Sequence, residues 1–106
     1  MNFRNIESFL SVDTHEAEKL GRLLAGILTS DLEKIRRGIR DNDPESIRFV
    51  AHSIKGASGN LGFQSLSQLA AVMETRTRAG QLDGLEDLLL EMQQLLEKLE
   101  DSLSGR

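Results

Sequence analysis

The chain has few of the side chains that carry chemistry: its 106 residues include no cysteine, tryptophan or tyrosine, two histidines and one proline. The absence of cysteine excludes a disulfide framework, a zinc–thiolate centre, a thiol nucleophile and a redox pair. The two histidines, His15 and His52, are far apart in the sequence, whereas zinc sites need three or four protein ligands. We therefore expect no metal site and no cofactor of the protein's own, in a single domain over residues 1–106.

An excess of positive charge and a long apolar run are also missing. The 17 acidic residues outnumber the 13 basic ones, which gives a net charge of −4, so the overall field repels nucleic-acid phosphates. No run approaches the roughly 18 apolar residues that span a bilayer. The N-terminal residues lack the apolar centre of a signal peptide. These features predict a cytoplasmic protein that binds neither nucleic acid nor membrane.

The sequence instead contains helical periodicity, with almost no strand signal. Apolar residues recur at three- and four-residue steps in four segments, at about 14–41, 44–61, 63–79 and after Asp83. Asp43 and Pro44 mark the second start, because aspartate caps a helix and proline suits its first position. Gly62 and Gly80 are placed to end the second and third segments. Since short connections make neighbouring helices antiparallel, the predicted fold is an all-α, antiparallel up-down four-helix bundle.

Two details of this bundle have alternatives. The first segment forms either one long helix or a helix that bends near Thr29 and Ser30. Its core face is predicted to consist of Ala17, Leu20, Leu24, Ile27, Leu28, Leu32, Ile35 and Ile39. A short additional helix ahead of the bundle would carry the apolar residues Phe3, Ile6, Phe9 and Leu10.

The second segment carries a histidine outside its apolar stripe. At about 100° per residue, the stripe that faces the bundle contains Ile47, Val50, Ala51, Ile54 and Leu61. By the same arithmetic His52 lies about 150° from the centre of that stripe, so we expect it to point outward. Most outward histidines are simply solvated, and the neighbours of His52 decide whether this one has a function.

Four neighbours favour a functional surface around His52. Gly56 and Gly59 lie on the same side of the helix as His52. Each glycine lowers helix stability by about 1 kcal/mol relative to alanine, a cost that is tolerated where another molecule must come close. Lys55 lies one turn away and can reach an anion on the imidazole. Phe49 is an apolar residue off the stripe, and either contacts a partner or packs on a neighbouring helix.

This set of residues suits phosphoryl transfer to or from a docked macromolecule. An imidazole with an ordinary pKa of about 6.5 is mostly neutral near pH 7, so one ring nitrogen is nucleophilic without a separate base. A nearby lysine stabilises the charge on the oxygens of a transferring phosphoryl group. No carboxylate cluster surrounds His52 in the sequence, and Mg²⁺ is therefore expected from the partner.

Residues 51–62, Ala-His-Ser-Ile-Lys-Gly-Ala-Ser-Gly-Asn-Leu-Gly, resemble the phosphoacceptor motif of histidine-containing phosphotransfer (HPt) domains. The family pattern is A-H-x-[LI]-K-G-x-[SA]-x-x-[LVI]-G, and the order and lengths of the predicted helices also fit the family. The resemblance implies phosphorylation of His52 on Nε2 with assistance from Lys55, and room for an incoming receiver domain at Gly56 and Gly59. It also implies that Glu74 accepts the Nδ1 proton of His52, although a glutamate late in a helix is more often solvated.

The resemblance also implies partners: the receiver domains of a hybrid sensor histidine kinase and of a response regulator, which exchange phosphate with a monomeric carrier. We expect a phosphotransfer intermediate rather than a true enzyme, and no phosphorylation from ATP, because no glycine-rich nucleotide loop is present. A patch of arginines that steers the acidic receiver pocket is a further hypothesis, formed by Arg36, Arg37, Arg40 and Arg48.

Other interpretations stay open at this stage. The motif is shared by the phosphoacceptor domain of chemotaxis-type kinases, and a non-catalytic helical adaptor that binds receiver domains would present the same face. His15 precedes a glutamate, as the histidine of sensor-kinase dimerisation helices does, but the residues that follow do not continue that pattern. We interpret His15 as a residue of the helix start.

Overall fold

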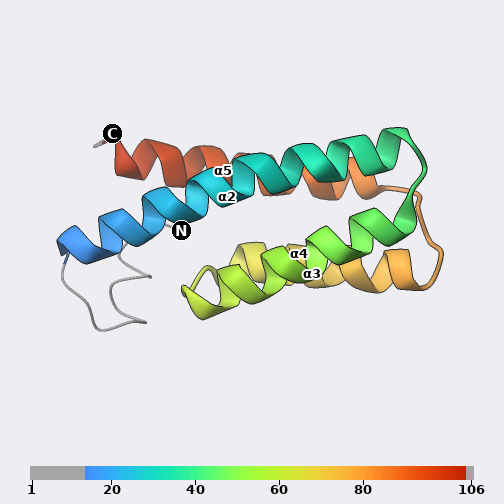
Figure 1. The fold of residues 1–106 in the computed structure, drawn as a ribbon, viewed down its shortest axis with the longest axis horizontal. Helices are drawn as coiled ribbons and strands as arrows, with labels where there is room; N and C mark the ends of the chain where they lie inside the picture. The colour runs from blue at the N-terminus through green and yellow to red at the C-terminus, as the bar shows by residue number, and fades with distance from the viewer. Residues whose placement is uncertain (1–13, 105–106) are drawn as a thin grey trace.

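The computed structural model describes residues 14–104, which form an all-α up-down bundle (Figure 1). Its helices are α2 (Thr14–Arg40), α3 (Pro44–Asn60), α4 (Gln64–Arg78) and α5 (Leu85–Leu103). The predicted fold class is confirmed, and each boundary agrees with the sequence to within about two residues. The expected short helix with Phe3, Ile6, Phe9 and Leu10 lies outside the described residues.

The four helices are arranged as two antiparallel pairs. In Figure 1, α2 and α5 form the upper pair and α3 and α4 the lower pair. Each helix packs on two neighbours, so that α3 contacts α2 and α4 but not α5. The interface between α3 and α4 is the most extensive of the four, and this interface carries the site described below.

Local signals in the sequence fix where the helices begin and end. The carboxylate of Asp43 accepts a hydrogen bond from the Ser46 amide at 3.2 Å, and Pro44 occupies the first turn of α3. Gly62 and Gly80 follow α3 and α4 with φ angles of 85° and 76°, which side chains other than glycine rarely adopt. Both predicted stops are confirmed. At the start of α5 the capping position belongs to Gly84 (φ 80°), without a side-chain cap.

α2 is one continuous α-helix from Thr14 to Arg40, and Thr29 and Ser30 lie inside it without a break. The hydroxyl of Thr29 donates to the carbonyl oxygen of Ala25 at 2.8 Å, within the helix. The prediction that Ile27 belongs to the core is wrong, because its side chain is 42% exposed. Ile27 lies about 100° from the centre of the buried stripe, at an edge of the helix that none of the described helices covers.

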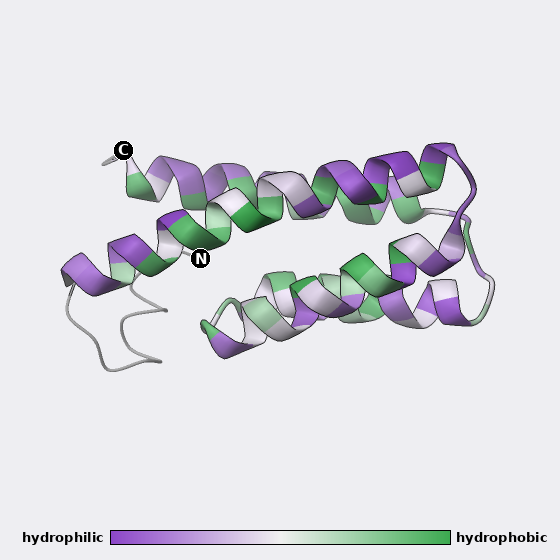
Figure 2. Cartoon of the chain, in the orientation of Figure 1, coloured by the Kyte–Doolittle hydropathy of each residue, from purple (hydrophilic) through white to green (hydrophobic). Residues whose placement is uncertain are grey.

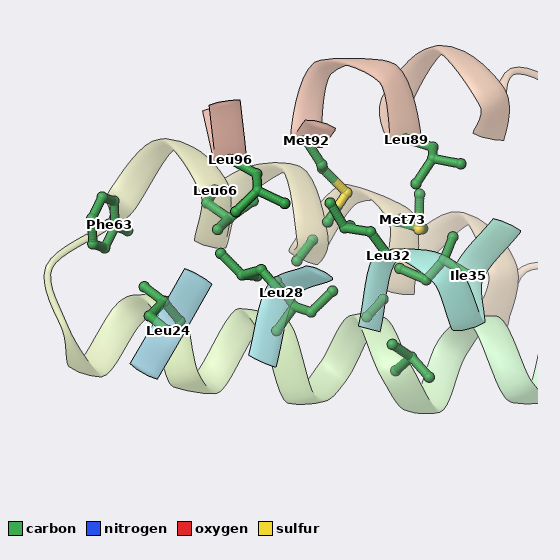
Figure 3. Close-up of a cluster of buried hydrophobic side chains, with 14 of the residues drawn as sticks. Leu24, Leu28, Leu32, Ile35, Phe63, Leu66, Met73, Leu89, Met92 and Leu96 are labelled. Carbon is green, nitrogen blue, oxygen red and sulfur yellow. The ribbon is translucent and has the colours of Figure 1, made fainter. Parts of the chain in front are cut away.

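The core fills the space between the helices along the length of the bundle. Figure 3 shows Leu28, Leu32 and Ile35 of α2 beside the methionines of the facing helices, Met73 and Met92. The leucines of α5 lie mostly in this core. Figure 2 shows hydrophobic and hydrophilic residues alternating along every helix, which is the pattern of helices that bury one face. None of the described helices is long and apolar enough to cross a membrane.

Ser58 is the polar exception in the core face of α3. It is fully buried, and its hydroxyl has no hydrogen-bond partner among the described residues. An unsatisfied buried hydroxyl costs about 1 kcal/mol or more, so Ser58→Ala is expected to raise the free energy of unfolding by about 1 kcal/mol, measured by urea denaturation. Ser67→Ala is the matched control and should lower it, since the Ser67 hydroxyl donates to the Lys55 carbonyl at 2.9 Å. A less stable Ser58→Ala variant would contradict this account.

Candidate functional site

His52 projects from the middle of α3, with its side chain 66% exposed. Ala51 and Ile54, which flank His52 in the sequence, are buried. Their burial sets which face of α3 points to the core, and His52 lies on the opposite face. The outward position predicted for His52 from the helical wheel is therefore confirmed. The imidazole stands on a packed helix rather than on a loop, which favours a defined orientation.

Glu74 of α4 lies directly beside His52 across the interface between α3 and α4. Its Oε2 atom is 2.7 Å from Nδ1 of His52, and its side chain is only 5% exposed. The general expectation that a glutamate late in a helix is solvated is wrong for this residue. Glu74 lies next to the buried Met73 on α4, and the packing of α3 against α4 encloses it.

Two basic side chains complete the surroundings of the Glu74 carboxylate. Lys55 Nζ donates to Oε1 at 2.6 Å, and Arg78 Nη2 donates to Oε2 at 3.2 Å. The sequence interpretation placed Lys55 beside the imidazole but did not identify its bond to Glu74, and it did not single out Arg78. The spacing of four residues between Glu74 and Arg78 was the available signal, since residues four apart on a helix are neighbours.

These contacts keep the Glu74 carboxyl ionised. The hydrogen bond from Lys55 lowers the pKa of Glu74 below its ordinary value of 4.5; burial acts against this, and the hydrogen bond with His52 adds to the lowering. A buried carboxylate without partners would instead be protonated more easily. The group that faces Nδ1 is therefore an anion near pH 7.

The ionised carboxylate fixes the tautomer of His52. A carboxylate only accepts hydrogen bonds, so the proton of this contact belongs to Nδ1 of His52, which donates to Oε2 of Glu74. In the neutral ring the lone pair then lies on Nε2. Because the side chain is largely exposed, this nucleophilic nitrogen is open to a second molecule.

The lowered pKa of Glu74 predicts a dependence of stability on pH. A carboxyl whose pKa is lower in the folded than in the unfolded state stabilises the fold fully above the unfolded value, and loses this contribution as the pH falls through the folded value. We expect the difference in unfolding free energy between wild type and Glu74→Gln to shrink as the pH falls from about 6 to about 3. Urea denaturation across this range measures it. A difference that stays constant would contradict the assigned charge.

The two glycines near His52 have different surroundings. A Cβ atom at Gly56 would meet no atom of residues 14–104 within 4 Å, whereas one at Gly59 would lie 3.3 Å from Oγ of Ser67 on α4. Ser67 in turn donates to the carbonyl oxygen of Lys55, so Gly59 lets α4 approach α3 beside the site. The packing of α3 against α4 therefore explains the glycine at position 59, while Gly56 is an open position on the surface.

Phe49 and Arg48 lie one turn before His52. Phe49 is 72% exposed as a residue, which excludes packing on a neighbouring described helix. Arg48 pairs with Glu45 at 2.9 Å, and two more members of the predicted arginine patch, Arg36 and Arg40, also pair with acidic neighbours on the surface. Their charges are thus partly compensated.

The remaining histidine, His15, is exposed in the first turn of α2.

Among residues 14–104, no group of three or more histidine, aspartate or glutamate side chains is arranged to hold a metal ion. The arrangement does provide an exposed imidazole nitrogen, a buried carboxylate behind it and a flanking ammonium. Such a set of side chains is typical of a class of proteins that exchange a group at a surface histidine with a docked molecule.

Comparison with known proteins places the chain within this class. The Hpt domain family model matches residues 22–102, so the chain belongs to the Hpt domain family and acts in histidine phosphotransfer within two-component phosphorelays. Its fold is similar to the crystal structure of the HPT domain of a sensor hybrid histidine kinase from Shewanella, with a TM-score of 0.80 at 22% sequence identity, over 99% of this chain and 91% of that one. A comparison with curated proteins finds no match.

Proposed function

We propose that His52 is the phosphoacceptor and that the phosphoryl group comes from, and passes on to, aspartates of receiver domains. The lone pair of Nε2 attacks phosphorus, the bond between phosphorus and the aspartate oxygen breaks, and the receiver carboxylate leaves as an anion. Nδ1 keeps its proton throughout, so the imidazole gains one positive charge as the N–P bond forms. The reverse step passes the group to the next aspartate.

The observation that carries this proposal is the 2.7 Å contact between Nδ1 and Glu74. It leaves Nε2 as the nucleophile, and it places a negative charge beside the ring on which positive charge develops. Lys55 lies one turn further along α3 and is 38% exposed, so its ammonium can turn from the carboxylate to the phosphoryl oxygens.

The surface around His52 suits a docked receiver domain. Phe49 offers an exposed apolar contact and Gly56 lets another backbone approach, while Arg48 adds a donor at the edge. The receiver supplies the Mg²⁺ that balances the charge of its own acyl phosphate. In this proposal the carrier is a monomer of the cytoplasm, where receivers of a hybrid kinase and of a response regulator meet it in turn.

Substitution of Gly56 separates docking from folding. Because open space surrounds this position, Gly56→Ala is expected to stabilise the protein by about 1 kcal/mol. Gly56→Leu should keep the fold but slow phosphate transfer by about tenfold or more. A tenfold effect corresponds to about 1.4 kcal/mol of lost docking free energy. Gly26→Leu is the matched control, since Gly26 is an exposed helical glycine of α2 with nothing nearby. Equal transfer rates for both leucine variants would contradict the docking role.

A panel of phosphorylated receiver domains, each incubated with the protein and Mg²⁺, tests the function directly. We expect phosphate to leave at least one receiver and to appear on this chain. Binding of receivers without any transfer would instead indicate an adaptor. Labelling by a chemotaxis-type kinase domain with ATP, in the absence of transfer from receivers, would indicate the phosphoacceptor domain of such a kinase.

A further inference from the structure

The two oxygens of the Glu74 carboxylate are not equivalent. Oε1 has Lys55 as its donor at 2.6 Å, whereas Oε2 accepts from both Nδ1 of His52 and Nη2 of Arg78. If Lys55 leaves, Oε1 loses its donor, while Oε2 keeps a cation and the imidazole. The carboxylate thus has two cations that can be removed one at a time.

A phosphoryl group on Nε2 changes the demand on Lys55. The group brings two negative charges next to Lys55. The Lys55 ammonium is already paired with the carboxylate of Glu74, which is almost completely buried. A buried carboxylate left without a cation is costly and tends to take up a proton. A protonated Glu74 would no longer stabilise the positive ring of phosphorylated His52.

We propose that Arg78 is a positioning residue: it holds Glu74 ionised and oriented toward Nδ1 of His52 while Lys55 turns to the phosphoryl group. This inference rests on the proposed function of His52. Arg78 is placed for the task because it lies one turn after Glu74 on α4 and reaches the oxygen that Lys55 does not occupy. In phosphorylated His52 the ring is positive and the phosphoryl group carries two negative charges. These charges and those of Glu74 and Lys55 leave one net negative charge, which Arg78 balances.

The exposure of Arg78 separates this role from a purely structural one. Its side chain is 65% exposed, and in a variant without it the buried Glu74 carboxylate keeps Lys55 as its cation. Arg78→Ala is therefore expected to fold normally. Its effect should emerge only when Lys55 is no longer available to Glu74.

One arm of the test needs no phosphate. In Lys55→Ala, which imitates the departure of Lys55, Arg78 should still hold the carboxylate, and the ¹⁵N NMR signals of His52 should show the proton on Nδ1 as in wild type. In Lys55→Ala/Arg78→Ala the population with Nδ1–H should fall. An unchanged ring tautomer in the double variant would overturn the proposal, whether or not His52 accepts phosphate.

The second arm uses phosphoramidate, a small phosphoryl donor that requires no receiver. In Arg78→Ala the phosphohistidine should form more slowly or hydrolyse faster, by about three- to tenfold, the range of one partly exposed charged contact. Arg78→Lys should recover most of this, and Arg76→Ala, which removes the same charge from α4, should match wild type. No loss in Arg78→Ala would overturn the proposal.

A Glu74→Gln background decides how Arg78 acts. The neutral amide of the Glu74→Gln variant needs no cation. Adding Arg78→Ala to Glu74→Gln should therefore change the rates of phosphohistidine formation and hydrolysis by less than about twofold, well below the effect of Arg78→Ala in the wild-type background. An equal loss in both backgrounds would show that Arg78 touches the phosphoryl group itself and would overturn the positioning role. Absence of any label on wild-type His52 would count against the phosphoacceptor function, and the NMR arm would still decide the role of Arg78.

Discussion

Replacement of His52 by glutamine is expected to abolish phosphate transfer from every receiver domain. Glutamine has no nucleophilic nitrogen, and His52 is the ring that the structure places on the exposed face of α3 with Nε2 open. The amount of phosphate on the chain, followed with a labelled receiver, should fall to background.

The same variant should fold as wild type does. The His52 side chain is mostly exposed, and substitutions on the surface usually change stability by less than about 0.5 kcal/mol. The helical circular-dichroism signal and the urea midpoint measure this. His15→Gln is the matched control because His15, the other histidine, is also exposed, and it should transfer at the wild-type rate. Transfer that survives in His52→Gln would refute the site.

Replacement of Glu74 by alanine is expected to have the second largest effect. It removes the acceptor for Nδ1 of His52 and the partner of Lys55 and Arg78 at once. Loss of a carboxylate that orients a metal-ligating histidine through the same kind of hydrogen bond costs about 10- to 100-fold. We expect a decrease of this size in the transfer rate, measured by quenched-flow with a phosphorylated receiver.

Glu74→Gln separates orientation from charge. The amide oxygen can still accept from Nδ1, so this variant should retain more activity than Glu74→Ala. The difference between Glu74→Gln and wild type reports the contribution of the negative charge to the developing imidazolium. Wild-type rates in both variants would show that the carboxylate has no part in the transfer.

The sequence predicts the parts of this molecule that depend on neighbours along the chain. Asp43 and Pro44 start α3, Gly62 ends it, and the periodicity of the apolar residues rotates His52 away from the core. All of these are local effects, because a helix converts spacing in the sequence directly into a direction in space. The motif around Lys55 and Gly56 lies within the same helix and could be recognised for the same reason.

Features that depend on contact between helices were harder to predict. The burial of Glu74 arises from the packing of α4 on α3, and its ion pair with Lys55 spans 19 positions of the sequence. The close approach of Ser67 to Gly59 is a contact of the same kind. Ile27 follows the apolar spacing but lies at the edge of the stripe, where the arrangement of the other helices decides whether it is covered.

The most direct test of this account is the identification of the ring nitrogen that carries the phosphate. The ¹⁵N-labelled protein, phosphorylated by a receiver domain with Mg²⁺, should show by NMR a phosphoryl group on Nε2 of His52 and a proton on Nδ1, in a linkage that is labile to acid and stable to base. Phosphate on Nδ1 of His52, on His15, or in an acid-stable ester would contradict the roles that we propose for Glu74 and His52.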